Sequence, residues 1–115
     1  MKARALIPDP YAGMNKTEKA YAQDLELRRL AHEIESWRFE RVTLRLGKDG
    51  RTTYTPDFLV IGVGGEQTFH EVKGFWRDDA RVKIKVAAHQ FPEYNFVAAQ
   101  KRPKREGGGW KIEEF

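Results

Sequence analysis

The period of hydrophobic and polar positions changes several times along the chain, and each change marks a predicted element. Asn15-Lys-Thr-Glu18 is a capping-box pattern, in which Asn15 accepts from first-turn amides and Glu18 reaches back to the Asn15 amide. The pattern predicts a helix that runs from this cap to about Ser36. Its apolar stripe, at helical spacing, consists of Tyr21, Leu25, Leu27, Leu30, Ala31, Ile34 and Trp37.

The next stretch alternates with the period of two that is typical of strands. Apolar and polar residues alternate over positions 42–46, and Gly47-Lys-Asp-Gly50 is a turn signal. Residues 53–63 are rich in β-branched and aromatic side chains. Because the run 58–63 is apolar apart from Gly62, it predicts a central strand that is covered on both faces.

The last third of the chain mixes helical and strand signals. Residues 78–91 fit either an alternating strand or a helical stripe, and their length and alanines favour a helix. Residues 94–99 read as a buried strand, residues 101–109 as a basic, glycine-rich loop, and residues 110–115 as an edge strand or a loosely packed end. The elements predict an α/β (α+β) fold in the order αβββαβ, with a central mixed sheet flanked by helices.

Composition is that of a small globular protein. The 115 residues suffice for one domain, with an arm (1–14), a core (15–100) and a C-terminal extension that includes the basic loop (101–115). The absence of cysteine excludes a disulfide framework, a cysteine zinc site and a thiol nucleophile. No apolar run approaches the roughly 20 residues of a membrane span, and the start lacks a signal-peptide core. We therefore expect no membrane contact and a cytoplasmic location.

Basic charge is concentrated in the second half of the chain. The net charge is only +4, but residues 77–105 hold eight Lys and Arg against three Asp and Glu. Such a local excess suits contacts to phosphates, although a solvated surface with a basic tail has the same composition. The predicted DNA-contacting residues are Arg77, Arg81, Lys83, Lys85, Lys101, Arg102, Lys104 and Arg105.

Two carboxylates and a lysine are predicted to meet at the open end of a hairpin formed by residues 57–63 and 67–73. If Gly64-Gly65-Glu66 is the loop, Asp57 lies opposite Lys73 and shares a sheet face with Glu71. A two-residue loop would place Asp57 on the other face. Such a group could bind a divalent cation, or it could be a structural ion pair of Lys73 with either acid.

These residues resemble the motif of the PD-(D/E)XK nuclease superfamily. Pro56-Asp57 matches the PD, and Glu71-Val72-Lys73 matches the ExK. The family core, which is restriction-endonuclease-like, has the same order of elements as the one predicted above. Several members place an acid on the first helix, and Glu18 matches that position. The chain most resembles short phage-encoded endonucleases and Holliday junction resolvases.

The resemblance implies a metal-dependent nuclease. Mg²⁺, or Mn²⁺, would be held by Asp57, Glu71 and the Val72 carbonyl, with Glu18 acting directly or through water. The metal would polarise the scissile phosphate, and Lys73 would orient the attacking water or neutralise developing charge. Hydrolysis would leave a 5′-phosphate.

The expected function is a structure-selective endonuclease that acts on branched DNA, most of all as a Holliday junction resolvase. Cutting both strands of a junction needs two active sites, so we expect a homodimer of C2 symmetry, in a bacterial or phage-infected cell. Two alternatives remain: a nicking, restriction or repair nuclease of the same fold, and a basic DNA-binding protein without catalysis.

Overall fold

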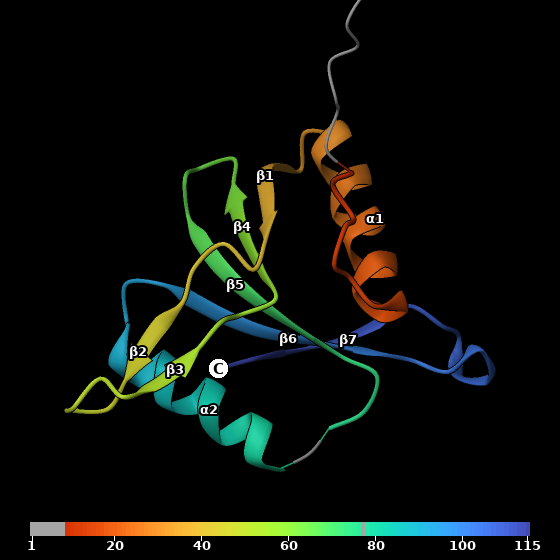
Figure 1. The fold of residues 1–115 in the computed structure, drawn as a ribbon. Helices are drawn as coiled ribbons and strands as arrows, with labels where there is room; N and C mark the ends of the chain where they lie inside the picture. Colours follow the sequence, from red (N-terminus) through yellow and green to blue (C-terminus); the bar gives the residue numbers. More distant parts are fainter. Residues whose placement is uncertain (1–8, 77) are drawn as a thin grey trace, which may run out of the picture.

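A five-stranded mixed sheet forms the centre of the molecule, in the order β1-β4-β5-β6-β7 (Figure 1). We describe residues 9–76 and 78–115 from a computed structural model. The elements are α1 (Lys16–Leu30), β1 (Ile34–Phe39), β2 (Leu44–Leu46), β3 (Thr52–Tyr54), β4 (Phe58–Gly62), β5 (Gln67–Lys73), α2 (Asp78–Gln90), β6 (Asn95–Lys101), a 3-10 turn (Lys104–Glu106) and β7 (Trp110–Glu114). Strands β2 and β3 form a separate ribbon. The predicted α+β class is confirmed.

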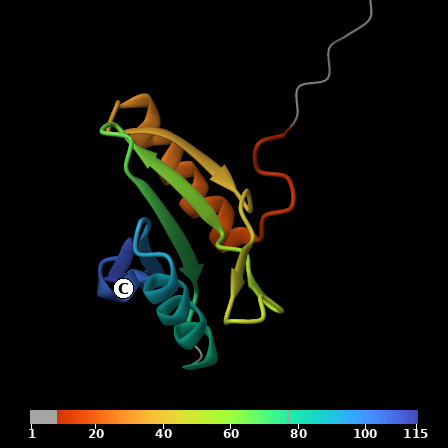
Figure 2. The ribbon, with the colours of Figure 1, turned by 90° about the vertical axis from the view of Figure 1, so that its left-hand side faces the viewer.

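The two faces of the sheet are covered by different elements (Figure 2). On one face, α1 contributes Tyr21, Ala22 and Leu25 to a core with Trp37, Phe58, Val60 and Val72. On the other face, α2 and the β2–β3 ribbon pack Leu46, Tyr54, Ile84 and Ala87 against Phe69 and Phe96. Strand β4 is therefore covered on both sides, as its apolar run predicted.

The first helix is shorter than predicted, and the first sheet strand was missed. The capping box is present, but α1 ends at Leu30 rather than near Ser36, and Leu27 and Leu30 lie exposed on its outer surface. Ile34 and Trp37 belong to β1, which pairs antiparallel with β4. Their spacing of three fits a helix by coincidence. A turn that includes His32 at φ 60° separates the two elements.

The strand predicted at residues 42–46 does not join the main sheet. It forms β2, which pairs only with β3 in the ribbon over α2. Without this ribbon, the main elements run helix, three strands, helix and two strands, so the expected order is present with β7 added, but β1 takes the place of the strand predicted at 42–46. The later elements also agree, because residues 78–90 form α2, residues 95–101 form β6, and β7 pairs with β6 as an edge strand.

The β4–β5 hairpin has a different register from the one predicted. Ile61 lies opposite Gln67, so the loop consists of residues 63–65 instead of residues 64–66. The Gly62 amide donates to the Glu66 carbonyl at 2.9 Å and closes the turn. Continuing this register places Asp57 opposite Glu71 rather than Lys73. Because the register shifts by an even number, both acids stay on the predicted face.

His70 lies on the opposite face of β5 from the acids, as its position in the strand predicted. Its Nδ1 atom is 2.6 Å from the hydroxyl oxygen of Tyr21. Burial, aided by the charge of Arg28, lowers the pKa of His70 to about 4. Burial also raises the pKa of Tyr21 to about 12. Both side chains are therefore neutral near pH 7, and the hydrogen bond between Tyr21 and His70 joins α1 to β5.

We expect His70→Gln to weaken the acid sensitivity of folding. Between pH 6.5 and about 4 the unfolded chain binds a proton at His70 that the native protein does not, so stability falls as the pH falls. The free energy of unfolding lost between pH 7 and pH 5 should be smaller by about 1–2 kcal/mol in the variant. Urea titrations measure it, with the exposed His89→Gln as control. An equal loss in all three proteins would contradict the assignment.

Candidate metal-binding and catalytic site

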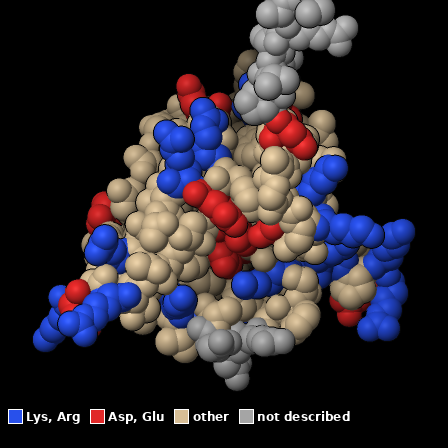
Figure 3. Space-filling model, in the orientation of Figure 1, with Lys and Arg blue, Asp and Glu red and all other residues tan. Residues whose placement is uncertain are grey.

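A pocket of about 530 Å³ opens where α1 begins, β5 ends and α2 begins. The residues that line it are Asn15, Thr17, Glu18, Asp57, Val72, Lys73, Gly74, Phe75 and Ala80. Figure 3 shows acidic side chains gathered near the centre of this face, with basic side chains around them. Four residues predicted for the site, Glu18, Asp57, Val72 and Lys73, are thus brought to one cavity.

Asp57 is held at the start of β4 by three chain segments. It follows Pro56, which is fully buried, and its Oδ2 atom accepts the Val72 amide at 2.8 Å. Its carbonyl accepts the Glu40 amide at 2.8 Å. The ends of β1, β4 and β5 are therefore joined at this residue, and its carboxylate has a fixed position at the pocket wall.

Glu71 lies behind Asp57 and is almost completely buried, with 8% of its surface exposed. Its Oε1 atom accepts from the Tyr54 hydroxyl at 3.2 Å and from the Asp57 amide at 3.3 Å. The Nζ atom of Lys73 is 3.7 Å from the other oxygen of Glu71. The structural ion pair considered from the sequence is thus formed with Glu71, beside Asp57.

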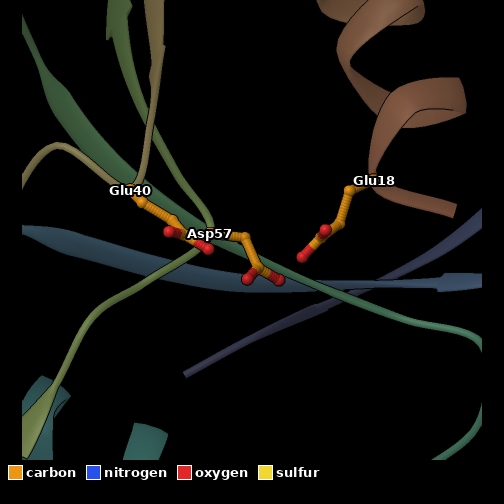
Figure 4. Close-up of side chains that lie close together, drawn as sticks. All are labelled: Glu18, Glu40 and Asp57. Carbon is orange, nitrogen blue, oxygen red and sulfur yellow. The ribbon is translucent and has the colours of Figure 1, made fainter. Parts of the chain in front are cut away.

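Glu18 serves both the helix and the pocket. Its Oε1 atom accepts the Asn15 amide at 2.9 Å, and its own amide donates to Asn15 at 2.8 Å, which completes the capping box. Its carboxylate also points toward Asp57, with Glu40 on the far side (Figure 4). One oxygen from each of Glu18, Glu40 and Asp57 lies within 4.8 Å of the others, which fits a shared metal ion.

Glu40 was missed by the sequence analysis. It is exposed, has a left-handed backbone (φ 47°) and directly follows β1. Because the end of β1 was assigned to no strand, nothing placed this acid at the same sheet end as Asp57. An exposed acid after a strand has no distinctive sequence pattern, and its place at the site is shown only by the fold, through its backbone bond to Asp57 and its distance to the other two acids.

Burial raises the pKa values of Asp57 and Glu71, the two most buried acids of the site. Burial, reinforced by the charge of Glu71, raises the pKa of Asp57 to about 8, although the Val72 amide and Lys73 oppose the shift. Burial likewise raises the pKa of Glu71 above its usual range. A divalent cation would relieve this repulsion, and carboxylate oxygens are the ligands that Mg²⁺ prefers. The donor set therefore fits a hard cation.

We expect Mg²⁺ to stabilise the protein more as the pH rises. Between pH 3.8 and about 8 native Asp57 keeps a proton that the unfolded chain has released, so its contribution to stability falls with rising pH. Millimolar Mg²⁺ should restore about 3–6 °C of Tm at pH 8.5 and less at pH 6.

Thermal unfolding of the wild type with and without Mg²⁺ measures this effect. Asp57→Asn should abolish the Mg²⁺ effect at both pH values, whereas Asp49→Asn, in an exposed turn, should keep it. A Tm gain that is equal at pH 6 and pH 8.5, or that survives in Asp57→Asn, would place cation binding elsewhere.

The basic residues predicted to contact DNA are absent from the described lining of the pocket. Lys73 is the only Lys or Arg among the described residues that line the cavity. Arg81 pairs with Glu113 of β7 and lies 4.7 Å from the centre of the Trp76 ring. The side chain of Arg77 lies outside the described residues. The exposed members of the set are Lys83, Lys85, Lys101, Arg102, Lys104 and Arg105.

The fold and the site together define an α+β protein with a lysine-flanked acidic pocket at the open end of a hairpin. The chain belongs to the family described as "Protein of unknown function (DUF1064)", which matches residues 1–107. Comparison with curated proteins and with solved structures gave no match. Within the described part of the chain, neither helix has the length and apolar character needed to cross a membrane.

Proposed function

We propose that the protein is a metal-dependent endodeoxyribonuclease that hydrolyses phosphodiester bonds. One observation carries the proposal: carboxylate oxygens of Glu18, Glu40 and Asp57 lie within 4.8 Å of one another, and Glu18 and Asp57 line the same pocket as Lys73, with Glu71 buried behind Asp57. Buried acids with raised pKa values beside a lysine are costly for folding, and such clusters are typical of functional sites.

In the proposed mechanism, the acids of the site bind the metal and Lys73 acts on the water and the phosphate. Asp57 and Glu18, with Glu71 behind, would hold Mg²⁺ or Mn²⁺, and Glu40 is added as a candidate ligand. A bound metal supplies a Lewis acid that polarises the phosphate and lowers the pKa of a coordinated water. Lys73, fixed by its approach to Glu71, orients the attacking water and neutralises charge that develops on the phosphate oxygens.

Branched DNA is the proposed substrate. Exposed cations lie on α2 and on the loop between β6 and β7, outside the described lining of the acidic pocket, and they suit contacts to backbone phosphates. Such contacts carry no base information, and a domain of this size has little surface left for reading bases. The protein would therefore select its substrate by the shape of the DNA, such as a four-way junction, rather than by base sequence. It would act in the cytoplasm of a bacterial or phage-infected cell.

Incubation with labelled DNA tests the proposal. A four-way junction and a linear duplex of the same sequence are each incubated with the protein in Mg²⁺, Mn²⁺ or EDTA. We expect cleavage only with metal, faster on the junction, with 5′-phosphate products. Equal cleavage of both substrates would favour a general nicking or repair nuclease. Binding without cleavage under all conditions would show a non-catalytic DNA-binding protein and refute the proposal.

We expect Lys85→Ala to flatten the salt dependence of DNA binding. Each phosphate contact contributes a slope of about −0.9 to the plot of log affinity against log salt concentration, so one lost contact reduces the slope by about that amount. Fluorescence anisotropy titrations at salt concentrations between about 50 and 300 mM measure this slope. Arg29→Ala, whose side chain pairs with Glu26, should keep the wild-type slope. An unchanged slope in Lys85→Ala removes that residue from the DNA path.

A further inference from the structure

Strand β7 forms an open edge of the main sheet. It pairs with β6 on one side and is last in the strand order of the described residues. The Phe115 amide donates to the Phe96 carbonyl at 3.0 Å, and the Arg102 amide donates to the Gly109 carbonyl at 2.9 Å. Because bonded pairs alternate in an antiparallel ladder, the odd-numbered residues of β7 bond toward β6.

The even-numbered residues of β7 therefore present their backbone groups outward. These residues are Trp110, Ile112 and Glu114, and each offers one amide donor and one carbonyl acceptor at the edge. An edge of this kind is a template for pairing with another strand unless its side chains prevent it. The side chains of β7 therefore determine whether a second strand can pair with this edge.

We propose that β7 pairs antiparallel with β7 of a second copy of this chain, about a two-fold axis at Ile112. In this register Ile112 faces Ile112 of the partner subunit, and Trp110 faces Glu114 of the partner subunit. Every outward amide of one strand then meets an outward carbonyl of the other. The 48% exposed Ile112 side chain is covered by its symmetry mate.

The charges of β7 select this register. Lys111 and Glu113 lie on the same face of the sheet, the one that α2 covers, as the pairing of Glu113 with Arg81 shows. Centred on Ile112, the pairing sets Lys111 opposite Glu113 of the partner subunit, twice by symmetry. Centring it on Lys111 or on Glu113 would instead oppose like charges, which destabilises a strand pair.

The other sheet edge is less suited to pairing. Strand β1 carries a register irregularity between Ile34 and Ser36, and bulged edges resist a new strand. Pairing through β7 gives one continuous sheet, with both α1 helices on one face. The pocket lies beyond β6 from this edge, about 10 Å away by strand spacing, so both pockets stay open.

Sedimentation equilibrium of the full chain, at protein concentrations between about 1 and 100 µM, tests the pairing. The wild type should dimerise. Ile112→Pro removes an outward amide and leaves the bonds to β6 intact, so the dissociation constant should rise at least about thirtyfold. Ile112→Thr keeps the amide and should stay within about threefold. A monomeric wild type, or Ile112→Pro that dimerises normally, would overturn the proposal.

Charge exchange tests the register and does not depend on the tolerance of a proline. Lys111→Glu and Glu113→Lys should each abolish dimerisation, because each opposes like charges. An equimolar mixture of the two variants should form a heterodimer, since both cross-strand pairs are then of opposite charge. A mixture that stays monomeric would refute the register. The measurement needs no DNA and no metal, so its result is independent of the proposed nuclease activity.

Discussion

Asp57→Asn should lower metal-dependent cleavage of a four-way junction by at least about a thousandfold. The substitution replaces a proposed metal ligand at the pocket wall by a neutral amide, and ionised carboxylates are the side chains that Mg²⁺ prefers. The fold should persist, because the asparagine oxygen can still accept the Val72 amide that Asp57 now accepts at 2.8 Å. Removing an ionised group from a buried position should also raise stability at pH 8.

Single-turnover cleavage and DNA binding in EDTA separate chemistry from affinity. We expect the same loss of rate in Glu71→Gln and Lys73→Ala, with DNA affinity within about threefold of the wild type. Asp49→Asn is the matched control and should cleave normally. A wild-type rate in any of the three site variants would remove that residue from the mechanism, and a rate that falls only with affinity would indicate a binding surface instead.

The sequence predicted the α+β class and the sheet face shared by Asp57 and Glu71, but not the exact register between their strands. Asp57 and Glu71 were placed on one face of a hairpin, and this survived an error of two residues in the register. The reason is physical: a strand repeats every two residues, so an even shift moves a side chain along the sheet without changing its face. The opposing residue is sensitive to the shift, and so Lys73 was wrongly set opposite Asp57.

The missed parts depend on contacts between distant segments. Ile34 and Trp37 fit the stripe of the preceding helix, and only their pairing with β4 shows that they belong to a strand. That error hid Glu40, whose relation to the site exists only because β1 ends beside Asp57. Arg81 stays a predicted phosphate contact, and the fold adds a partner that the sequence did not indicate, Glu113, which is 32 residues away along the chain.

Two roles of Glu18 can be tested separately, because the residue belongs both to the helix cap and to the acidic cluster with Glu40 and Asp57. Glu18→Gln should lower the cleavage rate by about a hundredfold and leave Tm within about 2 °C. Glutamine also forms capping boxes, so the helix start is preserved while the negative charge near Asp57 is lost.

Asn15→Ala gives the complementary result. It removes the side chain that accepts the Glu18 amide and should cost about 1 kcal/mol of stability. The Asn15 amide remains to hold the Glu18 carboxylate in place, so the cleavage rate should stay within about threefold. Urea unfolding and single-turnover cleavage of both variants measure the two effects. If activity followed stability in both proteins, Glu18 would be a capping residue only, and the metal would depend on Asp57, Glu71 and Glu40.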